Sequence, residues 1–264
     1  MKRLIYQVCL GRQGDSKLYE KCIDSVAKYA ERHGIEHYVQ RTPILKIKPD
    51  PFTSNRSTDS WQKHGGFLPI YEKENAFNLL TQFDQIAIID ADIYIRPDAP
   101  NIFDEMECKC AMGVVFEREM PITEAYIAKI RNYSQMQYHS LHSNKADFKP
   151  NSRGFEFANV GMIVLNSETF LPYLNDQTAK EFLQRMEFKD FVDGIGAWKW
   201  STDQTLLNYF IKKYKVPVKH LDWQWNGLYG ANTKIDECYF IHFFLKDLLP
   251  EQGENVDQLM EDIK

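Results

Sequence analysis

The segment from Gln85 to Ile95 constrains the fold of this chain more than any other, because an unbroken apolar run leads directly into two acids. Its sequence is QIAIIDADIYI. A short continuous run of this kind, rich in isoleucine, indicates a strand buried on both faces of a parallel or mixed sheet. Side chains alternate along a strand, so we expect Asp90 and Asp92 to project to one side and Ala91 to the other.

Two carboxylates held close together in a partly buried place repel each other and lose hydration, unless a cation or a proton offsets the cost. Oxygen ligands suit Mg²⁺ or Mn²⁺, which bind few protein carboxylates and complete their shell with water and substrate phosphates. The segment therefore predicts a divalent-cation site at the end of a strand. The alternative is a pair of aspartates that cap the following turn, since a motif as short as D-x-D also arises by chance.

The composition is that of a globular protein with a sizeable core: 264 residues, of which 44% are hydrophobic and 26% charged. The net charge of -5 offers no basic footprint, so we expect no nucleic-acid partner. The apolar run after Met1 is too short for a signal peptide, and no segment reaches the length of a transmembrane span. Five scattered cysteines without zinc-ligand spacing indicate reduced thiols, and we expect a cytoplasmic location.

The remaining pattern alternates strands with helices and predicts a single α/β domain over residues 1–250, followed by an acidic tail over 251–264 that forms a short helix or frays. Its central sheet is expected to be mixed, mostly parallel and flanked by helices, because the chain begins with a βαβ unit. A polar segment over 139–153, with His139, His142 and Lys145, is predicted to be a lid. Strands are expected at 4–10, 36–41, 85–95, 111–116, 155–165, 216–225 and 238–245, and helices at 17–33, 67–80, 122–138, 168–186 and 203–214, with a long loop over 43–60.

Several polar residues fall where an open α/β sheet binds its ligands, at the carboxyl ends of strands. Asn159 and Gly161 interrupt an apolar strand, Asp203 and Gln204 open a helix, and His242 lies inside an aromatic strand. Each has a structural alternative: a β-bulge at Asn159, a first-turn acid at Asp203, and a core histidine at His242.

Taken in their order along the chain, these motifs resemble those of the GT-A glycosyltransferases, and most closely the retaining family 8 enzymes, which use nucleotide sugars. The resemblance extends from the first strand to about Lys246. It rests on Ile88–Asp92, on Phe157–Met162 with Asn166, on Asp203-Gln204 with Asn208, on Trp225-Asn226, and on His242 with Lys246.

The resemblance implies a metal-dependent donor site. Asp90, Asp92 and His242 would coordinate Mn²⁺, or Mg²⁺, against the diphosphate of the donor, which is expected to be a UDP-sugar. Asp203 and Gln204 would be the catalytic pair, with Gln204 close to the anomeric carbon. Lys73 stands where relatives often carry arginine, and Lys246 follows the histidine sooner than in the family. In addition to the metal ligands, the residues that would contact the donor are Gly11, Lys73, Ala91, Asn159 and Lys246.

The reaction that this resemblance implies is transfer of a hexose to a hydroxyl acceptor with retention of configuration. No general base is obvious, which fits a front-face mechanism in which the departing phosphate takes the proton of the acceptor. Inversion with Asp203 as base stays open, as do a non-catalytic carbohydrate-binding or scaffolding protein and a sugar nucleotidyltransferase. The last would need a glycine-rich basic loop after the first strand, and residues 11–14 match it only in part.

The acceptor is expected to be a saccharide or another molecule with a free hydroxyl. Aromatic faces pack on the C–H faces of sugars, and four of the five tryptophans of the chain fall in one region. Core packing is the alternative, because tryptophan is highly buried on average. The predicted acceptor residues are Trp198, Trp200, Trp223, Trp225 and Tyr229.

Overall fold

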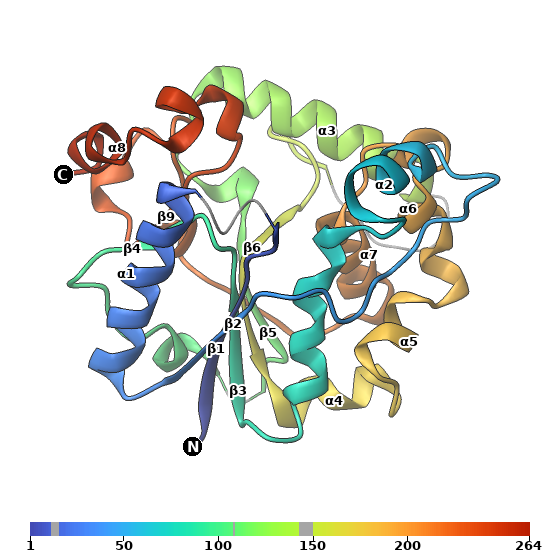
Figure 1. Ribbon diagram of the computed structural model, residues 1–264, viewed down its shortest axis with the longest axis horizontal. Helices are drawn as coiled ribbons and strands as arrows, with labels where there is room; N and C mark the ends of the chain where they lie inside the picture. The colour runs from blue at the N-terminus through green and yellow to red at the C-terminus, as the bar shows by residue number, and fades with distance from the viewer. Residues whose placement is uncertain (12–15, 108, 143–149) are drawn as a thin grey trace.

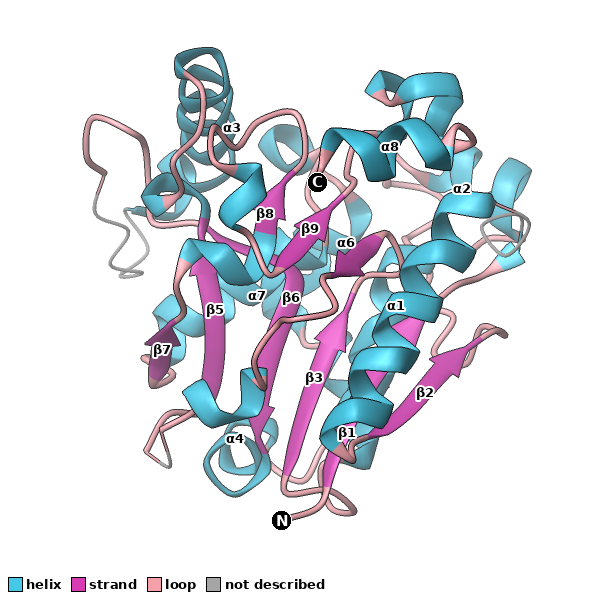
Figure 2. Ribbon diagram, turned by 90° about the vertical axis from the view of Figure 1, so that its left-hand side faces the viewer, coloured by secondary structure: helices cyan, strands magenta, loops and turns pink. Residues whose placement is uncertain are grey.

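The computed structural model describes residues 1–11, 16–107, 109–142 and 150–264. Its centre is a six-stranded mixed sheet in the order β2-β1-β3-β6-β5-β7. β1 pairs in parallel with β2 and β3, as β5 does with β7, while β6 runs antiparallel to both of its neighbours. The predicted mixed α/β sheet is confirmed (Figure 2). The strands are β1 (Arg3–Val8), β2 (Glu36–Gln40), β3 (Gln85–Ile89), β5 (Met112–Phe116), β6 (Ala158–Asn166) and β7 (Val218–His220).

A second, smaller sheet lies beside the end of the first, in the order β4-β9-β8 (Figure 2). It is built from β4 (Ile93–Ile95), β8 (Gly227–Leu228) and β9 (Phe240–His242). The prediction of one continuous strand over 85–95 is therefore wrong. The chain leaves the large sheet after Ile89, turns through residues 90–92, and enters the small sheet at Ile93, because β4 finds its partner in β9 and not in β6.

Helices cover both faces of the large sheet (Figure 1). The bounds of α1 and α7 agree with the sequence prediction, and α1 ends at Gly34 in the left-handed conformation that favours glycine. Ser16 precedes α1 but makes no capping hydrogen bond with its side chain. The helices are α1 (Lys17–His33), α2 (Ser57–His64), α3 (Glu124–His142), α4 (Ser167–Leu174), α5 (Ala179–Leu183), α6 (Lys189–Asp193), α7 (Asp203–Tyr214) and α8 (Val256–Asp262).

The core forms two apolar layers, one on each face of the sheet. Ile86 and Ile88 of β3 pack in the layer that contains Phe210 of α7, whereas Ala87 and Ile89 pack in the layer that contains Val26 of α1. Burial on both faces explains why β3 is an unbroken apolar run, since neither set of alternating side chains meets water. With its backbone fixed by β1 and β6, the carboxyl end of β3 is a rigid place for a site.

Some predicted elements differ in type or length. The helix expected over 67–80 is a 3₁₀-helix, η2 (Pro69–Leu79), the loop over 43–60 runs into α2, and the helix over 168–186 is divided between α4 and α5. The strand expected over 216–225 is limited to β7, after which the chain forms the 3₁₀-helix η7 (Trp223–Asn226). In the predicted lid, residues 143–149 lie outside the described residues.

The end of the chain packs on the body of the protein. Leu259 of α8 and the following Ile263 are buried in an apolar cluster with Leu18 and Cys22 of α1. The guanidinium of Arg96 donates to the carbonyl oxygen of Ile263. Residues 256–262 therefore form the short helix expected there. In the part of the chain that the structure describes, no helix combines the length and apolar character needed to cross a membrane.

Candidate active site

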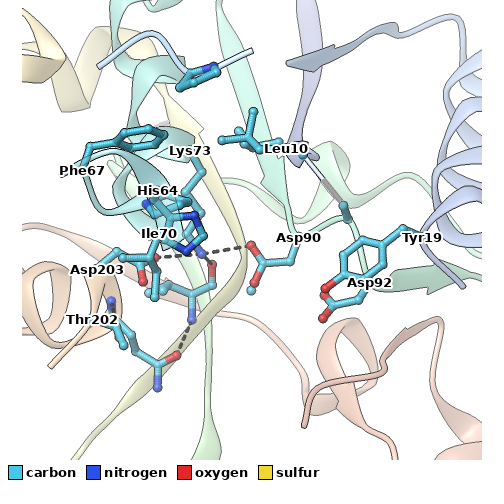
Figure 3. Close-up of a pocket in the computed structure, with 18 of the residues that line it drawn as sticks. Leu10, Tyr19, His64, Phe67, Ile70, Lys73, Asp90, Asp92, Thr202 and Asp203 are labelled. Atoms are coloured by element: carbon cyan, nitrogen blue, oxygen red, sulfur yellow. Dashed lines mark hydrogen bonds and ion pairs between the residues drawn. The ribbon is translucent and has the colours of Figure 1, made fainter. Parts of the chain in front are cut away.

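A cavity of about 1180 Å³ opens at the carboxyl ends of β1 and β3 (Figure 3). Its walls come from segments far apart in the sequence: the end of β1 with the start of α1, the turn after β3, the start of β6, the start of α7, and the region from α2 to η2. Nine of the predicted site residues line it: Gly11, Lys73, Asp90, Ala91, Asp92, Asn159, Asp203, Gln204 and His242.

Asp90, Asp92 and His242 meet at one edge of this cavity. Because β4 pairs with β9, Ile93 lies opposite His242, and the backbone N–H of Phe243 donates to the carbonyl oxygen of Asp92 at 3.0 Å. Nε2 of His242 is 3.3 Å from Oδ1 of Asp92 and 3.9 Å from Oδ2 of Asp90. One ligand atom from each of the three residues lies within 4.8 Å of the others.

The donor set fits a divalent cation. Two carboxylate oxygens and one imidazole nitrogen lie close together, and the adjoining cavity leaves room for further ligands. Carboxylate oxygens suit Mg²⁺ and Mn²⁺, while imidazole is a ligand more typical of transition metals. The composition of this site therefore suits a divalent transition metal as well as Mg²⁺.

The electrostatics of the three residues are coupled. Burial raises the pKa of Asp90, and the neighbouring carboxylate of Asp92 raises it further, against the opposing effect of Lys73. Burial disfavours the charged form of His242, but the carboxylates of Asp92 and Asp90 outweigh it and raise the pKa of the imidazole. The charged form of Asp90 thus bears a cost that a bound cation would offset.

Gly161 makes room for the histidine. A Cβ atom built on Gly161 would lie 2.7 Å from Nδ1 of His242 and closer still to Cε1 of the same ring. Any side chain there would displace the imidazole from the carboxylates. The glycine inside an apolar strand, which predicts a close approach of backbone or ligand, is explained by this contact.

Lys73 joins the turn after β3 to the start of α7. Its ammonium donates to Oδ1 of Asp90 at 3.0 Å and to the carbonyl oxygen of Val160 at 2.9 Å, and it lies 2.8 Å from Oδ2 of Asp203 (Figure 3). Burial alone would lower the pKa of this lysine, but Asp203 and Asp90 outweigh that effect and raise it. Lys73 is 9% exposed, and its ammonium pairs with two acids. Its first role is therefore to hold Asp90 and Asp203 in place.

Asn159 and Gln204 meet at a buried acid that sequence reasoning missed. Glu117, directly after β5, accepts a hydrogen bond from Nδ2 of Asn159 at 2.7 Å and another from Nε2 of Gln204 at 3.3 Å. The backbone N–H of Val160 donates to the amide oxygen of Gln204 at 3.2 Å. The only local signal was an acid at the end of an apolar strand, VVFE, which by itself does not identify a partner.

The region from α2 to η2 supplies a wall that sequence analysis did not assign to the site, although it predicted a loop over 43–60 and a helix over 67–80 there. Lys63, His64, Phe67 and Ile70 line the cavity from this side. Arg56, at the start of α2, donates to the carbonyl oxygen of Trp198 at 3.1 Å and to Oγ of Ser201 at 2.9 Å. This wall is thereby tied to the loop that precedes Asp203.

Lys246 lies at the margin of the site. Its ammonium donates to Oγ of Ser16 at 3.1 Å and lies 4.5 Å from the ring centroid of Tyr19, which lines the cavity. Lys246 is not itself among the described residues that form the lining.

The five aromatic residues predicted to bind the acceptor are dispersed, and none is among the described residues that line the cavity. Trp225 is 2% exposed and packs on Tyr239 and Phe240. Trp198 donates its indole N–H to the carbonyl oxygen of Gln137, whereas Trp200 is 64% exposed. Trp223 is partly buried near Lys234, and the hydroxyl of Tyr229 donates to Asp262 of α8.

Comparisons with known proteins give no match to a protein-family model and none to a curated protein sequence. Solved structures are similar over almost the whole chain. They include mouse xyloside xylosyltransferase 1 in its apo form, with 14% identity over 95% of this chain and 100% of that chain and a TM-score of 0.50. Another is a glycosyltransferase involved in the glycosylation of the major capsid of PBCV-1, with 11% identity, 97% and 100% coverage and a TM-score of 0.53.

A third similar structure is an active-site mutant of LgtC, with 12% identity, 98% of this chain and 95% of that chain covered, and a TM-score of 0.53. At such low identity these likenesses establish the architecture alone. The chain has the GT-A glycosyltransferase fold.

Proposed function

We propose that this protein is a metal-dependent glycosyltransferase that moves a hexose from a nucleoside diphosphate sugar, with a UDP-sugar as the preferred donor, to a hydroxyl group. The observation that carries the proposal is the convergence of Asp90, Asp92 and His242 at the rim of a large cavity in a chain with the GT-A fold. A binding site for a diphosphate needs positive charge beside space for a base and a sugar, and a cation held by these three residues would supply that charge.

Mn²⁺ bound by Asp90, Asp92 and His242 would neutralise the charge that develops on the diphosphate as it leaves. The turn of residues 90–92 is held by Lys73 and by the small sheet, so the two carboxylates are ordered before the donor binds. The ammonium of Lys246, above Tyr19 at the margin of the cavity, is positioned to add charge on the phosphate side. Gly11 and Ala91 keep that side open for the rest of the donor.

Asn159, Asp203 and Gln204 line the cavity beyond the metal ligands, and we assign the sugar of the donor to them. Asp203 is 3% exposed and paired with Lys73, which makes it a poor base for an acceptor hydroxyl. Its engagement favours retention, in which the departing phosphate takes the acceptor proton and the amide of Gln204 lies near the anomeric carbon. NMR of the product decides this point, since an inverted anomer would remove the role of Gln204.

For the acceptor we propose a saccharide that approaches between the region from α2 to η2 and the loop before Asp203. Trp200, the most exposed of the predicted aromatic residues, belongs to that loop, and Trp198 lies beside it. Trp225 supports the site from within the core, where it has no free face for a ligand. Trp223 and Tyr229 belong to the neighbourhood of the small sheet.

The test is to incubate the protein with a panel of nucleotide sugars, with and without Mn²⁺, and to measure the release of free nucleoside diphosphate. Release that requires the metal supports the proposal. Donor binding by calorimetry without any release would favour the non-catalytic carbohydrate-binding alternative. Neither binding nor release from any donor would refute the enzyme assignment.

A further inference from the structure

Three buried side chains and the partly buried Gln204 form one hydrogen-bonded chain at the candidate sugar site. Nδ2 of Asn226 donates to Oδ1 of Asn159 at 2.9 Å, and Nδ2 of Asn159 donates to Oε1 of Glu117 at 2.7 Å. From the other side, Nε2 of Gln204 donates to the same carboxylate oxygen at 3.3 Å. Asn226 is fully buried, and Asn159 and Glu117 are each 6% exposed.

The carboxylate gives this chain its direction. An amide has an oxygen that accepts and a nitrogen that donates, so a row of amides alone can be satisfied with either end turned around. An ionised carboxylate only accepts, and it therefore requires the nitrogen of both Asn159 and Gln204 to face Glu117. The amide oxygens then lie on the other side, where that of Asn159 accepts from the backbone N–H of Gly161 at 3.0 Å and that of Gln204 from the backbone N–H of Val160 at 3.2 Å. These two backbone groups hold the same orientation that the carboxylate of Glu117 requires.

The fold brings the members together from four separate elements. Glu117 follows β5, Asn159 lies on β6, Gln204 is in the first turn of α7, and Asn226 ends η7. The register between β5 and β6 shifts after Val114, so that Val115 pairs with Asn159. This irregularity lies two residues before Glu117 in the chain, and the β-bulge alternative for Asn159 is thus part of how the site is built.

Burying the carboxyl group of Glu117 costs folding free energy, and the structure shows a benefit only at the candidate site. No ion pair among the described residues involves Glu117, and burial raises the pKa of its carboxyl group against the opposing effect of the hydrogen bonds from Asn159 and Gln204. A buried acid with amide partners alone stabilises a fold less than an apolar residue of similar volume would. The residues that gain from it are the two amides that line the cavity.

We propose that Glu117 is a positioning residue that fixes the amide orientation of Asn159 and Gln204, so that Gln204 presents its carbonyl oxygen, and not its NH₂ group, to the sugar of the donor. The inference rests on the proposed function of the same cavity. A carbonyl oxygen beside the anomeric carbon stabilises the positive charge that develops there as the leaving group departs, whereas an NH₂ group would oppose it. Glu117 acts through Gln204 and does not touch the substrate.

The orientation itself is tested without turnover, by the side-chain amide signals of the ¹⁵N-labelled protein. Asn159→Ala and Gln204→Ala identify the two pairs of signals by their loss. Glu117→Gln should shift both pairs and speed their hydrogen exchange, because the new amide accepts without charge and also donates. Glu156→Gln is the matched control: it removes a carboxylate paired with Arg118, the residue next to Glu117, outside the amide chain. Signals that move no more in Glu117→Gln than in the control would overturn the proposal.

The catalytic consequence is read from steady-state kinetics of the same variants. Loss of a charged hydrogen-bond partner predicts a fall in kcat of about 10-fold for Glu117→Gln and about 100-fold for Glu117→Ala, with a smaller change in the KM for the donor. Glu156→Gln should retain kcat within about twofold, as expected for a change outside the site. An equal loss in Glu156→Gln, or a change confined to KM, would contradict a positioning role. If the wild-type protein turns over no donor, the proposed function fails, and the amide spectra still decide what Glu117 orients.

Discussion

Replacing Gly161 by alanine tests the candidate metal site without changing any of its ligands. The new Cβ atom would lie 2.7 Å from Nδ1 of His242, whereas ordinary van der Waals contact begins at 3.4 Å. The ring must therefore retreat by at least 0.7 Å, the difference between the two distances. Nδ1 has no hydrogen-bond partner among the described residues, so packing against Gly161 is what holds this edge of the ring.

A retreat of this size exceeds the roughly 0.2 Å tolerance of metal–ligand distances. We expect Gly161→Ala to weaken Mn²⁺ binding by about 10- to 100-fold, the effect typical of a disturbed ligand environment. The measurement is calorimetric titration of the purified protein with MnCl₂ and no nucleotide, so that the result does not depend on knowing the donor. Unfolding temperatures, measured in parallel, distinguish loss of the site from loss of the fold.

Gly113→Ala is the matched control. Gly113 lies on the buried strand β5, where a Cβ atom would meet Sδ of Met106 at 2.6 Å. This variant introduces a similar crowding in the core with no contact to His242, and it should bind Mn²⁺ as the wild type does. Wild-type affinity in Gly161→Ala would refute the placement of His242 as a ligand, and equal weakening in both variants would show that the effect is general.

Four further outcomes follow from the same geometry. Asp92→Asn should abolish metal-dependent release of nucleoside diphosphate while the circular dichroism spectrum stays unchanged; activity that survives would return the two acids to a turn-capping role. Lys73→Met leaves Asp90 and Asp203 without their shared cation and should cost about 3–5 kcal/mol of unfolding free energy in urea, whereas Lys28→Met, at an exposed pair with Asp24, should change it little. Burial raises the pKa of Glu117 above its ordinary value of 4.5, so on raising the pH the unfolded chain loses this proton before the folded protein does. The unfolding free energy should therefore fall as the pH rises from about 4.5 through the pKa of the folded state. Glu117→Gln should remove this contribution, and an unchanged slope of unfolding free energy against pH would contradict the prediction. Trp200→Ala should raise the KM for the acceptor and leave the KM for the donor unchanged, so an unaltered acceptor KM would exclude Trp200 from the acceptor site.

Local patterns predicted those parts of the structure that depend on local forces. The apolar periodicity and the glycine stop give α1 its observed bounds, and the apolar run of β3 follows from burial on both faces. The motifs of Asp90, Asn159, Gln204 and His242 were read from the sequence, and the structure places all four residues in one cavity. Only Asp90 follows the carboxyl end of a strand of the large sheet; Asn159 lies at the amino end of the antiparallel β6, which meets the same edge of that sheet.

What the sequence could not give depends on contacts between distant segments. Glu117 has partners that lie 42 and 87 positions away, and no local pattern encodes either distance. The clustering of tryptophans near the end of the chain suggested one surface, yet the fold buries Trp225 and exposes Trp200. A sequence shows that a side chain is large and aromatic, but the helix, strand or loop that carries the residue sets the direction in which the side chain points.

The break of the predicted strand at Asp90 shows how the candidate site depends on the second sheet. On one continuous strand, Asp90 and Asp92 would be two residues apart, with a separation of about 6.6 Å along the strand. In the structure the chain turns between β3 and β4, where the backbone N–H of Ile93 donates to the carbonyl oxygen of Asp90 at 3.1 Å, and one ligand atom from each aspartate and from His242 lies within 4.8 Å of the others. The pairing of Ile93 with His242 then brings the histidine to the same point. The small sheet therefore brings His242 to the two aspartates of the candidate metal site, and a change that unpairs β4 from β9 should remove the candidate site while the large sheet remains.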